Sequence, residues 1–121
     1  MAKRALIVDD SDASRDSLSF ALKQKGFEVT QAVDGEDGMI QCTASDGFDL
    51  IITDINMPRL TGLEMVKKIR TLSKFKFTPI IVLSSEEDVI KDSIAAGASA
   101  WIPKSSKMSQ QLVETIHKLV P

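Results

Sequence analysis

Carboxylate, hydroxyl and ammonium side chains follow short apolar stretches at four places in this 121-residue chain. In chain order these side chains are Asp9 and Asp10, Asp54, Ser84, and Lys104. Three carboxylates brought to one place repel one another, and their pKa values rise unless a cation offsets them. A hard dication such as Mg²⁺ prefers oxygen ligands of this kind. Lys104 adds a positive charge and Ser84 a hydroxyl donor, so the set suits phosphoryl transfer, which depends mostly on positioning and charge neutralisation.

These side chains can act together only if the fold brings four separate segments to one place. Short apolar stretches alternate with helical patterns along the chain, and they predict strands over 5–8, 27–32, 50–53, 79–83 and 98–102. Alternating strands and helices predict a single α/β domain over residues 1–121, with a doubly wound parallel sheet of five strands. The carboxyl ends of parallel strands share one edge of the sheet, so we expect the polar residues to meet there.

Polar residues with capping propensity precede the predicted helices. The candidates are Ser11 or Asp12, Asp34, Thr61 with Glu64 at the capping-box spacing, Ser84 or Ser85, and Ser106 or Ser109. In the fourth helix, Glu86, Glu87 and Asp88 would favour the positive end of the helix dipole. In the last helix the apolar spacing predicts an inward face made of Leu112, Val113, Ile116 and Leu119.

Composition limits the function classes. Hydrophobic residues make up 43% of the chain and charged residues 26%, which indicates a folded domain with a real core. The formal net charge of −2 leaves no basic footprint, so we expect no direct binding to nucleic acid, and the basic residues Lys67, Lys68 and Arg70 are interpreted as a solvated helical face. A single cysteine, Cys42, and an apolar N-terminal stretch too short for a signal peptide or a membrane span predict a soluble cytoplasmic protein.

Each candidate residue also has an ordinary structural interpretation. An aspartate at the end of a strand is more often a turn former or a helix cap, an isolated Ser84 is more often a cap, and an isolated Lys104 is more often a surface charge. The conjunction changes this balance, because four predicted strand ends place complementary groups at one edge of the sheet.

The chain resembles the receiver domains of response regulators, of the chemotaxis CheY type, over essentially its whole length. The motifs that match are Val8-Asp9-Asp10-Ser11, Asp54-Ile55-Asn56-Met57-Pro58 with Gly62, Leu83-Ser84-Ser85, Ala95-Ala96-Gly97-Ala98, and Lys104. The resemblance implies a flavodoxin-like (βα)5 fold with the strand order 2-1-3-4-5.

The resemblance also implies a role for each site residue. Asp54 is the phosphoacceptor. Asp9, Asp10 and Asp54, with the backbone carbonyl of Asn56, hold Mg²⁺. Ser84 binds the phosphoryl group after it moves, Lys104 contacts a phosphoryl oxygen, and Trp101 is the aromatic switch residue. The pair Asn56 and Glu86 tunes dephosphorylation and resembles that of regulators that lose phosphate quickly.

The implied function is that of a receiver in a two-component phosphorelay. A sensor histidine kinase would donate the phosphoryl group, and the surface of the fourth helix, fifth strand and fifth helix would then control a partner protein, as in chemotaxis. The chain would assist its own phosphorylation and dephosphorylation without being an enzyme on external substrates, and would be a monomer or a weak phosphorylation-dependent dimer. Three alternatives stay open: a receiver excised from a multidomain regulator, a degenerate receiver that binds partners without phosphorylation, and a phosphohydrolase with an aspartyl-phosphate intermediate. The last is disfavoured because Asn56 stands where such enzymes place a second Asp.

One departure from the family pattern follows Lys104. Receivers usually have a proline after this lysine, often with a cis peptide bond, whereas this chain has Ser105 there and Pro103 before the lysine. A cis bond without proline costs about 3–4 kcal/mol. We therefore predict a trans Lys104–Ser105 bond with a rearranged loop.

Overall fold

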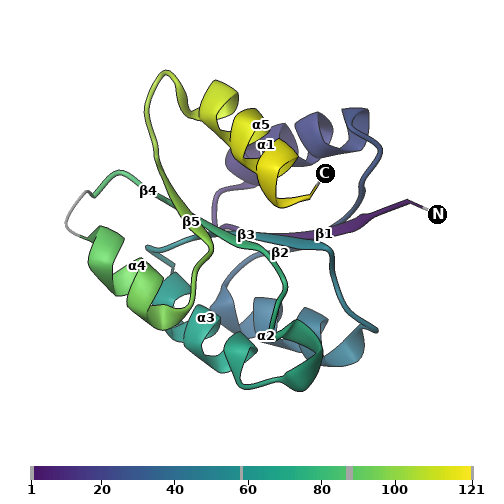
Figure 1. Ribbon diagram of the computed structural model, residues 1–121, viewed down its shortest axis with the longest axis vertical. Coiled ribbons are helices and arrows are strands. Elements are labelled where there is room, and N and C mark those ends of the chain that lie inside the picture. The colour runs from purple at the N-terminus through teal and green to yellow at the C-terminus, as the bar shows by residue number, and fades with distance from the viewer. Residues whose placement is uncertain (1, 58, 87–88, 121) are drawn as a thin grey trace.

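The computed structural model describes residues 2–57, 59–86 and 89–120. These residues form a five-stranded parallel sheet in the order β2-β1-β3-β4-β5. Helices α1 and α5 cover one face of the sheet, and α2, α3 and α4 cover the other (Figure 1). The predicted doubly wound α/β fold and its strand order are confirmed.

The strands lie within two residues of their predicted bounds: β1 (Arg4–Val8), β2 (Glu28–Ala32), β3 (Leu50–Asp54), β4 (Ile80–Ser84) and β5 (Ala100–Pro103). The helices between and after them are α1 (Asp12–Gln24), α2 (Gly35–Ala44), α3 (Gly62–Arg70), the short 3₁₀ helix η1 (Ser73–Phe75), α4 (Ile90–Ala96) and α5 (Met108–Leu119). No helix in the part of the chain that the structure describes is long and apolar enough to cross a membrane.

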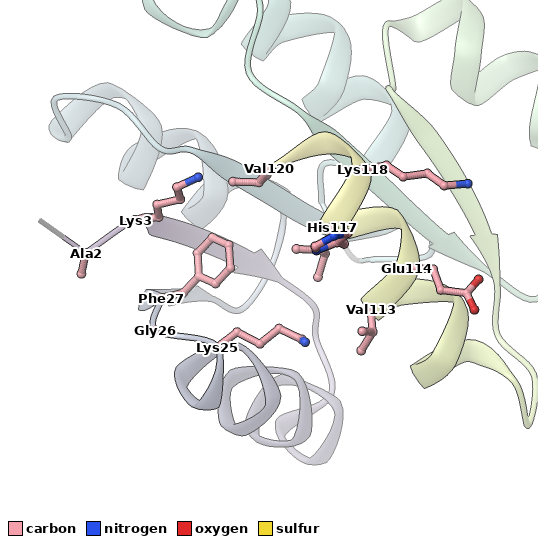
Figure 2. Close-up of a pocket in the computed structure, with 11 residues that line it drawn as sticks. Ala2, Lys3, Lys25, Gly26, Phe27, Val113, Glu114, His117, Lys118 and Val120 are labelled. Carbon is pink, nitrogen blue, oxygen red and sulfur yellow. The ribbon is translucent and has the colours of Figure 1, made fainter.

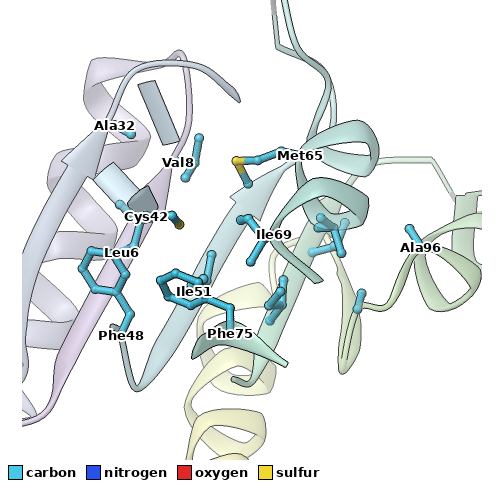
Figure 3. Close-up of a cluster of buried hydrophobic side chains, with 14 of the residues drawn as sticks. Leu6, Val8, Ala32, Cys42, Phe48, Ile51, Met65, Ile69, Phe75 and Ala96 are labelled. Atoms are coloured by element: carbon cyan, nitrogen blue, oxygen red, sulfur yellow. The ribbon is translucent and has the colours of Figure 1, made fainter. Parts of the chain in front are cut away.

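The central strands are apolar on both sides because both faces of the sheet are covered. In β3, Ile51 faces the layer of α2, α3 and α4, where it packs with residues that include Leu6, Met65 and Phe75 (Figure 3). Its neighbours Leu50 and Ile52 face the opposite layer of α1 and α5. Burying a large aliphatic side chain contributes roughly 1.5–3 kcal/mol. The ends of these strands, which carry the polar residues, are therefore held on a rigid support.

Three of the predicted helix starts are confirmed. The side chains of Ser11, Asp34 and Thr61 accept hydrogen bonds from the backbone N–H groups three residues later, and Thr61 forms a complete capping box with Glu64. Such caps typically contribute about 1 kcal/mol each. The Asp34 cap begins α2, and the Thr61 cap begins α3.

The predicted starts of the fourth and fifth helices are wrong. Helix α4 begins at Ile90, and the Ser84 hydroxyl accepts a hydrogen bond from the Glu86 N–H instead of capping a helix. The Glu87 and Asp88 positions lie outside the described residues. Helix α5 begins at Met108, where neither Ser106 nor Ser109 provides a cap. In each of these loops a serine satisfies a local backbone N–H without starting a helix: Ser84 accepts from Glu86, and Ser105 accepts from Lys107.

The predicted inward face of α5 also needs one correction. Leu112 and Ile116 are buried and Leu119 is partly buried, but Val113 is 40% exposed. Val113 lies about 100° around the helix from Leu112 and lines the groove between α5 and α1 instead of facing the sheet.

Candidate functional site

The polar residues at the strand ends meet at one edge of the sheet. Asp54 is the last residue of β3 and lies opposite Leu83 of β4, and Ser84 is the last residue of β4 and lies opposite Pro103 of β5. The N–H of Lys104 donates to the Ser84 carbonyl at 2.9 Å, which holds the loop after β5 against β4. The parallel pairing therefore brings together residues that are far apart in the sequence.

Three carboxylates form a compact acidic cluster at this edge. Asp9, Asp10 and Asp54 each place a carboxylate oxygen within 4.8 Å of the other two. Asp9 and Asp54 are buried, whereas Asp10 is exposed. An all-oxygen donor set with one open, solvent-facing member fits a hard divalent cation that retains some of its water.

The Asp54 carboxylate is held by one charged side chain and one backbone N–H. The Lys104 ammonium lies 3.0 Å from Asp54 Oδ2, and the Ile55 N–H donates to Oδ1 at 2.8 Å. The Thr53 hydroxyl donates to the Asp54 backbone carbonyl at 2.8 Å. The carboxylate is thus fixed in orientation while 8% of its side chain stays accessible.

Every described peptide bond is trans, so the predicted trans Lys104–Ser105 bond is confirmed. The loop retains the lysine in contact with Asp54 despite the absence of proline at position 105. The Ser105 hydroxyl instead accepts a hydrogen bond from the Lys107 N–H.

Burial raises the pKa of Asp9, because removal from water penalises the charged carboxylate. The negative charges of Asp54 and Asp10 raise the pKa of Asp9 further. A hydrogen bond from the Ser11 N–H and the positive charge of Lys104 lower it in part. The direction of the net shift shows that the folded protein holds this negative charge at a cost when no cation is bound.

We predict that Asp9→Asn stabilises the protein at neutral pH in the absence of divalent cations. A raised pKa means that the folded state binds the proton more tightly than the unfolded state, so stability is lost as pH rises from 3.8 through the folded value. The variant should gain on the order of 1 kcal/mol, because it removes a buried charge together with its repulsion by Asp54. Urea unfolding with chelator at pH 7 and pH 3 measures the gain, which should vanish at the lower pH.

Asp46→Asn is the matched control for that comparison, because Asp46 is an exposed carboxylate in the loop before β3, at the other end of the sheet. If Asp46→Asn gains as much unfolding free energy as Asp9→Asn, or if the gain of Asp9→Asn persists at pH 3, the buried Asp9 charge is not what destabilises the folded protein.

Two further residues support the site, although the sequence did not predict them as site residues. Arg15 is buried in α1 and donates to the Asp9 backbone carbonyl at 2.7 Å, with further contacts to Asp12 and Gln31. Gly62 begins α3 so close to β3 that a Cβ there would lie 2.1 Å from the Asp54 carbonyl oxygen. Gly62 belongs to a motif noted in the sequence, whereas nothing in the sequence distinguishes Arg15 from an ordinary helical arginine.

The remaining predicted residues are Asn56, just after β3, Glu86, just after β4, and Trp101 in β5. The Asn56 amide lies 3.4 Å from a Glu86 carboxylate oxygen, and both side chains are exposed. Trp101 packs partly buried against the core on the α3 and α4 side of the sheet. Its indole Nε1 is buried without a hydrogen-bond partner among the described residues.

Two hollows lie on the layer of α1 and α5. The larger, of about 750 Å³, lies near the start of β1 and the end of α5, where residues such as Lys25, Phe27 and His117 surround it (Figure 2). None of the predicted site residues lines it. The smaller, of about 500 Å³, is a groove between α1 and α5 that reaches Asp9, Lys104 and Ser105, so this second hollow is the one that adjoins the acidic cluster.

Fold and site together define a doubly wound α/β protein whose strand ends present an acidic cluster with one lysine-paired aspartate. The model of the response regulator receiver domain matches residues 5–117. The chain belongs to this family: it is a CheY-like receiver domain of a two-component response regulator.

Curated relatives contain the domain in proteins of different length. The chain is 32% identical over 120 residues to the sensory/regulatory protein RpfC of Xanthomonas campestris, with 96% of the chain and 16% of that protein covered. It is 35% identical over 104 residues to the chemotaxis protein CheY1 of Helicobacter pylori, with 84% of each covered. The chain thus spans a small part of some relatives and most of others.

Solved structures share the fold over nearly the whole chain. The chemotaxis response regulator CheY4 of Vibrio cholerae has a TM-score of 0.90 and 35% identity, with 99% of this chain and 100% of that one covered. The response regulator TrrA of Thermotoga maritima, solved in complex with Mg²⁺ and BeF, has a TM-score of 0.86 and 34% identity, with coverage of 98% and 99%.

Proposed function

We propose that Asp54 accepts a phosphoryl group from a phosphohistidine of a sensor histidine kinase and that the adduct switches a partner-binding surface. The observation that carries this proposal is the position of Asp54: its carboxylate contacts Lys104 at 3.0 Å and belongs to a cluster with Asp9 and Asp10. In the transfer, an Asp54 oxygen forms a bond to phosphorus as the bond from phosphorus to the imidazole nitrogen breaks, and that nitrogen keeps the electron pair.

The residues of the cluster fit a bound Mg²⁺, which would be held by Asp9, Asp10, Asp54 and the Asn56 backbone carbonyl. When bound, the ion supplies positive charge next to the phosphoryl oxygens. The Ile55 N–H fixes the Asp54 carboxylate through Oδ1, which leaves Oδ2, beside the Lys104 ammonium, as the oxygen that would bond to phosphorus. Lys104 would then neutralise a phosphoryl oxygen. The groove between α1 and α5 opens on Asp9 and Lys104 and supports an approach of the donor from this side.

The proposed switch runs from Ser84 to Trp101. The Ser84 hydroxyl oxygen accepts a hydrogen bond from the Glu86 N–H at 3.0 Å, and after the side chain moves its O–H would donate to a phosphoryl oxygen. Its displacement would leave room for Trp101 to turn further inward, and the surface of α4, β5 and α5 would change. Ile90 and Ile94 are exposed on α4, which supports this helix as part of a partner-binding surface. A local charge event then biases a two-state equilibrium.

We further propose that the protein acts in the cytoplasm in chemotaxis-like signalling and is not an enzyme on external substrates. The likeness to CheY1 and CheY4 supports the chemotaxis assignment. Asn56, two residues after Asp54, cannot donate a proton as a second aspartic acid would, which opposes a phosphohydrolase. The intact set of charged residues opposes a degenerate receiver that works without phosphorylation.

Phosphorylation by acetyl phosphate tests the proposed function. Intact mass with Mg²⁺ should show one phosphoryl adduct per chain, and an excess of chelator should abolish it. The fluorescence of Trp101, the only tryptophan, should change with the same time course, because the buried indole would move. Turnover of a small phosphate ester without a stable adduct would favour the phosphohydrolase, and no adduct at all would favour the degenerate receiver.

The lifetime of the adduct should depend on Asn56 and Glu86. These side chains contact one another at 3.4 Å, in the loops that follow Asp54 and Ser84, and we propose that they orient the water that attacks phosphorus. The double variant Asn56→Ala with Glu86→Ala should lengthen the lifetime of the adduct by about tenfold. This is less than the 10²–10⁴-fold rate effect of a directly placed general base, because the two side chains only orient the water. Decay of the adduct by intact mass after removal of the donor measures the change, and Ser85→Ala, at an exposed neighbouring position, is the control.

A further inference from the structure

An exposed aromatic side chain lies far from the acidic cluster, in the loop between η1 and β4. Phe77 is 88% exposed, the highest value among the exposed large hydrophobic residues of the described chain. A single exposed apolar side chain is common on protein surfaces, so Phe77 is informative only together with the groups that surround it. The core does not use this ring: the neighbouring Phe75 is fully buried and stacks on Phe48.

The surroundings of Phe77 are positively charged. Between Glu64 and Glu86 the chain has no carboxylate, but it has Lys67, Lys68, Arg70, Lys74 and Lys76. The Lys76 ammonium lies 5.6 Å from the centroid of the Phe77 ring. Among the described residues neither Lys74 nor Lys76 forms an ion pair with a carboxylate; the Lys74 ammonium instead donates to the Thr43 and Ser45 carbonyls. We call Lys74, Lys76 and Phe77 the basic aromatic patch.

Arg70 keeps the backbone of this patch in place. The sequence suggested a solvated arginine, but its guanidinium is partly buried and donates to the carbonyls of Phe75 and Thr78, at 2.8 and 2.7 Å. It also donates to the Gly97 carbonyl at 2.9 Å, so one side chain links the end of α3, the loop around Phe77 and the end of α4. Burial lowers the pKa of Arg70, and no carboxylate in the described residues pairs with it.

A preorganised loop that presents an aromatic ring among cations is typical of a binding surface. Fixing the loop in advance lowers the entropy that a partner must overcome, and aromatic residues dominate the energetics of protein interfaces. Carbonyl oxygens satisfy the donors of Arg70 and Lys74 but leave their positive charges without an anionic partner. The patch therefore complements a segment that combines carboxylates with an apolar side chain.

From the geometry we propose that the basic aromatic patch docks an acidic protein segment that carries an apolar residue, independently of phosphorylation. The patch lies at the amino end of β4, where the Pro79 carbonyl accepts from the Ile51 N–H, whereas Asp54 lies at the other end of β3. A partner bound there leaves the acidic cluster open. A membrane surface is the weaker match, because a single aromatic residue and no amphipathic helix would insert.

Fluorescence polarisation with a labelled peptide, a central leucine between two runs of glutamate, tests the proposal. We expect saturable binding that weakens as salt is raised. Phe77→Ala should weaken it roughly five- to tenfold, which is more than truncation costs at most interface positions. Lys74→Gln with Lys76→Gln should weaken it and flatten its salt dependence. Two controls should bind as wild type: Ile40→Ala, which truncates an exposed apolar residue on α2, and Lys107→Gln, which removes an exposed charge before α5.

Three results would overturn the proposal: no saturable binding of the peptide, equal weakening by Ile40→Ala and Phe77→Ala, or binding to vesicles with phosphatidylserine in place of the peptide. Because Phe77 is exposed, its truncation should leave the melting temperature near that of wild type, and this is checked first. Asp54→Asn should bind the peptide as wild type does, so failure here is distinguishable from failure of the phosphoacceptor assignment.

Discussion

Replacing Asp54 with asparagine should leave the protein without any phosphoryl adduct. The asparagine side chain would occupy nearly the same volume and could still accept the hydrogen bond from the Ile55 N–H, which Asp54 Oδ1 now accepts at 2.8 Å. The amide lacks the nucleophilic, negatively charged oxygen that must bond to phosphorus. Intact mass after incubation with acetyl phosphate and Mg²⁺ should therefore show the adduct for wild type and none for the variant.

Two comparisons make this result specific. Asp46→Asn makes the same chemical change near the amino end of β3, and it should be phosphorylated as wild type is. Lys104→Ala keeps Asp54 but removes the ammonium 3.0 Å from it, so it should slow the appearance of the adduct without abolishing the site. An adduct on Asp54→Asn at the wild-type level would place the phosphoacceptor elsewhere.

Gly62→Ala should cost about 3 kcal/mol of unfolding free energy, near the upper end of what overpacking costs. A Cβ at this position would lie 2.1 Å from the Asp54 carbonyl oxygen and 2.9 Å from the Ile55 Cα, and both atoms belong to the backbone. Backbone cannot rotate out of the way as a side chain can, so α3 or the end of β3 must move. Because Asp54 moves with it, phosphorylation by acetyl phosphate should also slow.

Gly38→Ala is the matched control within α2. Its Cβ would meet the Met65 sulfur at 2.6 Å and a Val8 methyl group at 3.2 Å, and both belong to side chains, of which methionine is the flexible one. Alanine also favours a helix over glycine by about 0.8–1.0 kcal/mol, so this variant should lie within about 1 kcal/mol of wild type. Urea unfolding of the two variants measures the difference, and equal costs would show that the close approach of α3 to Asp54 is not what requires glycine.

The rigid end of α4 shows how a sequence pattern and a tertiary contact combine. Gly97 ends α4 with a φ of 112°, a left-handed conformation that favours glycine. The same glycine lies against Arg70, whose Cγ would be 2.8 Å from an added Cβ. The first requirement is local and readable, whereas the second depends on α3 and α4 being side by side.

The sequence by itself determined the succession of strands and helices along the chain. Apolar stretches mark the strands, and Ser11, Asp34 and Thr61 mark helix starts, and both are local signals. It also placed Asp9, Asp10, Asp54, Ser84 and Lys104 at strand ends, and a parallel sheet requires those ends to share an edge. It did not determine the starts of α4 and α5, because a serine after a strand caps a turn as readily as a helix.

Only the tertiary structure decided which side chains touch. It buried Arg15 against the Asp9 carbonyl, placed Lys104 3.0 Å from Asp54 without the usual proline, and turned Arg70 from a surface charge into the support of the exposed Phe77. No spacing of residue types along the chain indicates any of these contacts. They depend on distances of a few ångströms, and these are set by how the helices pack on the sheet.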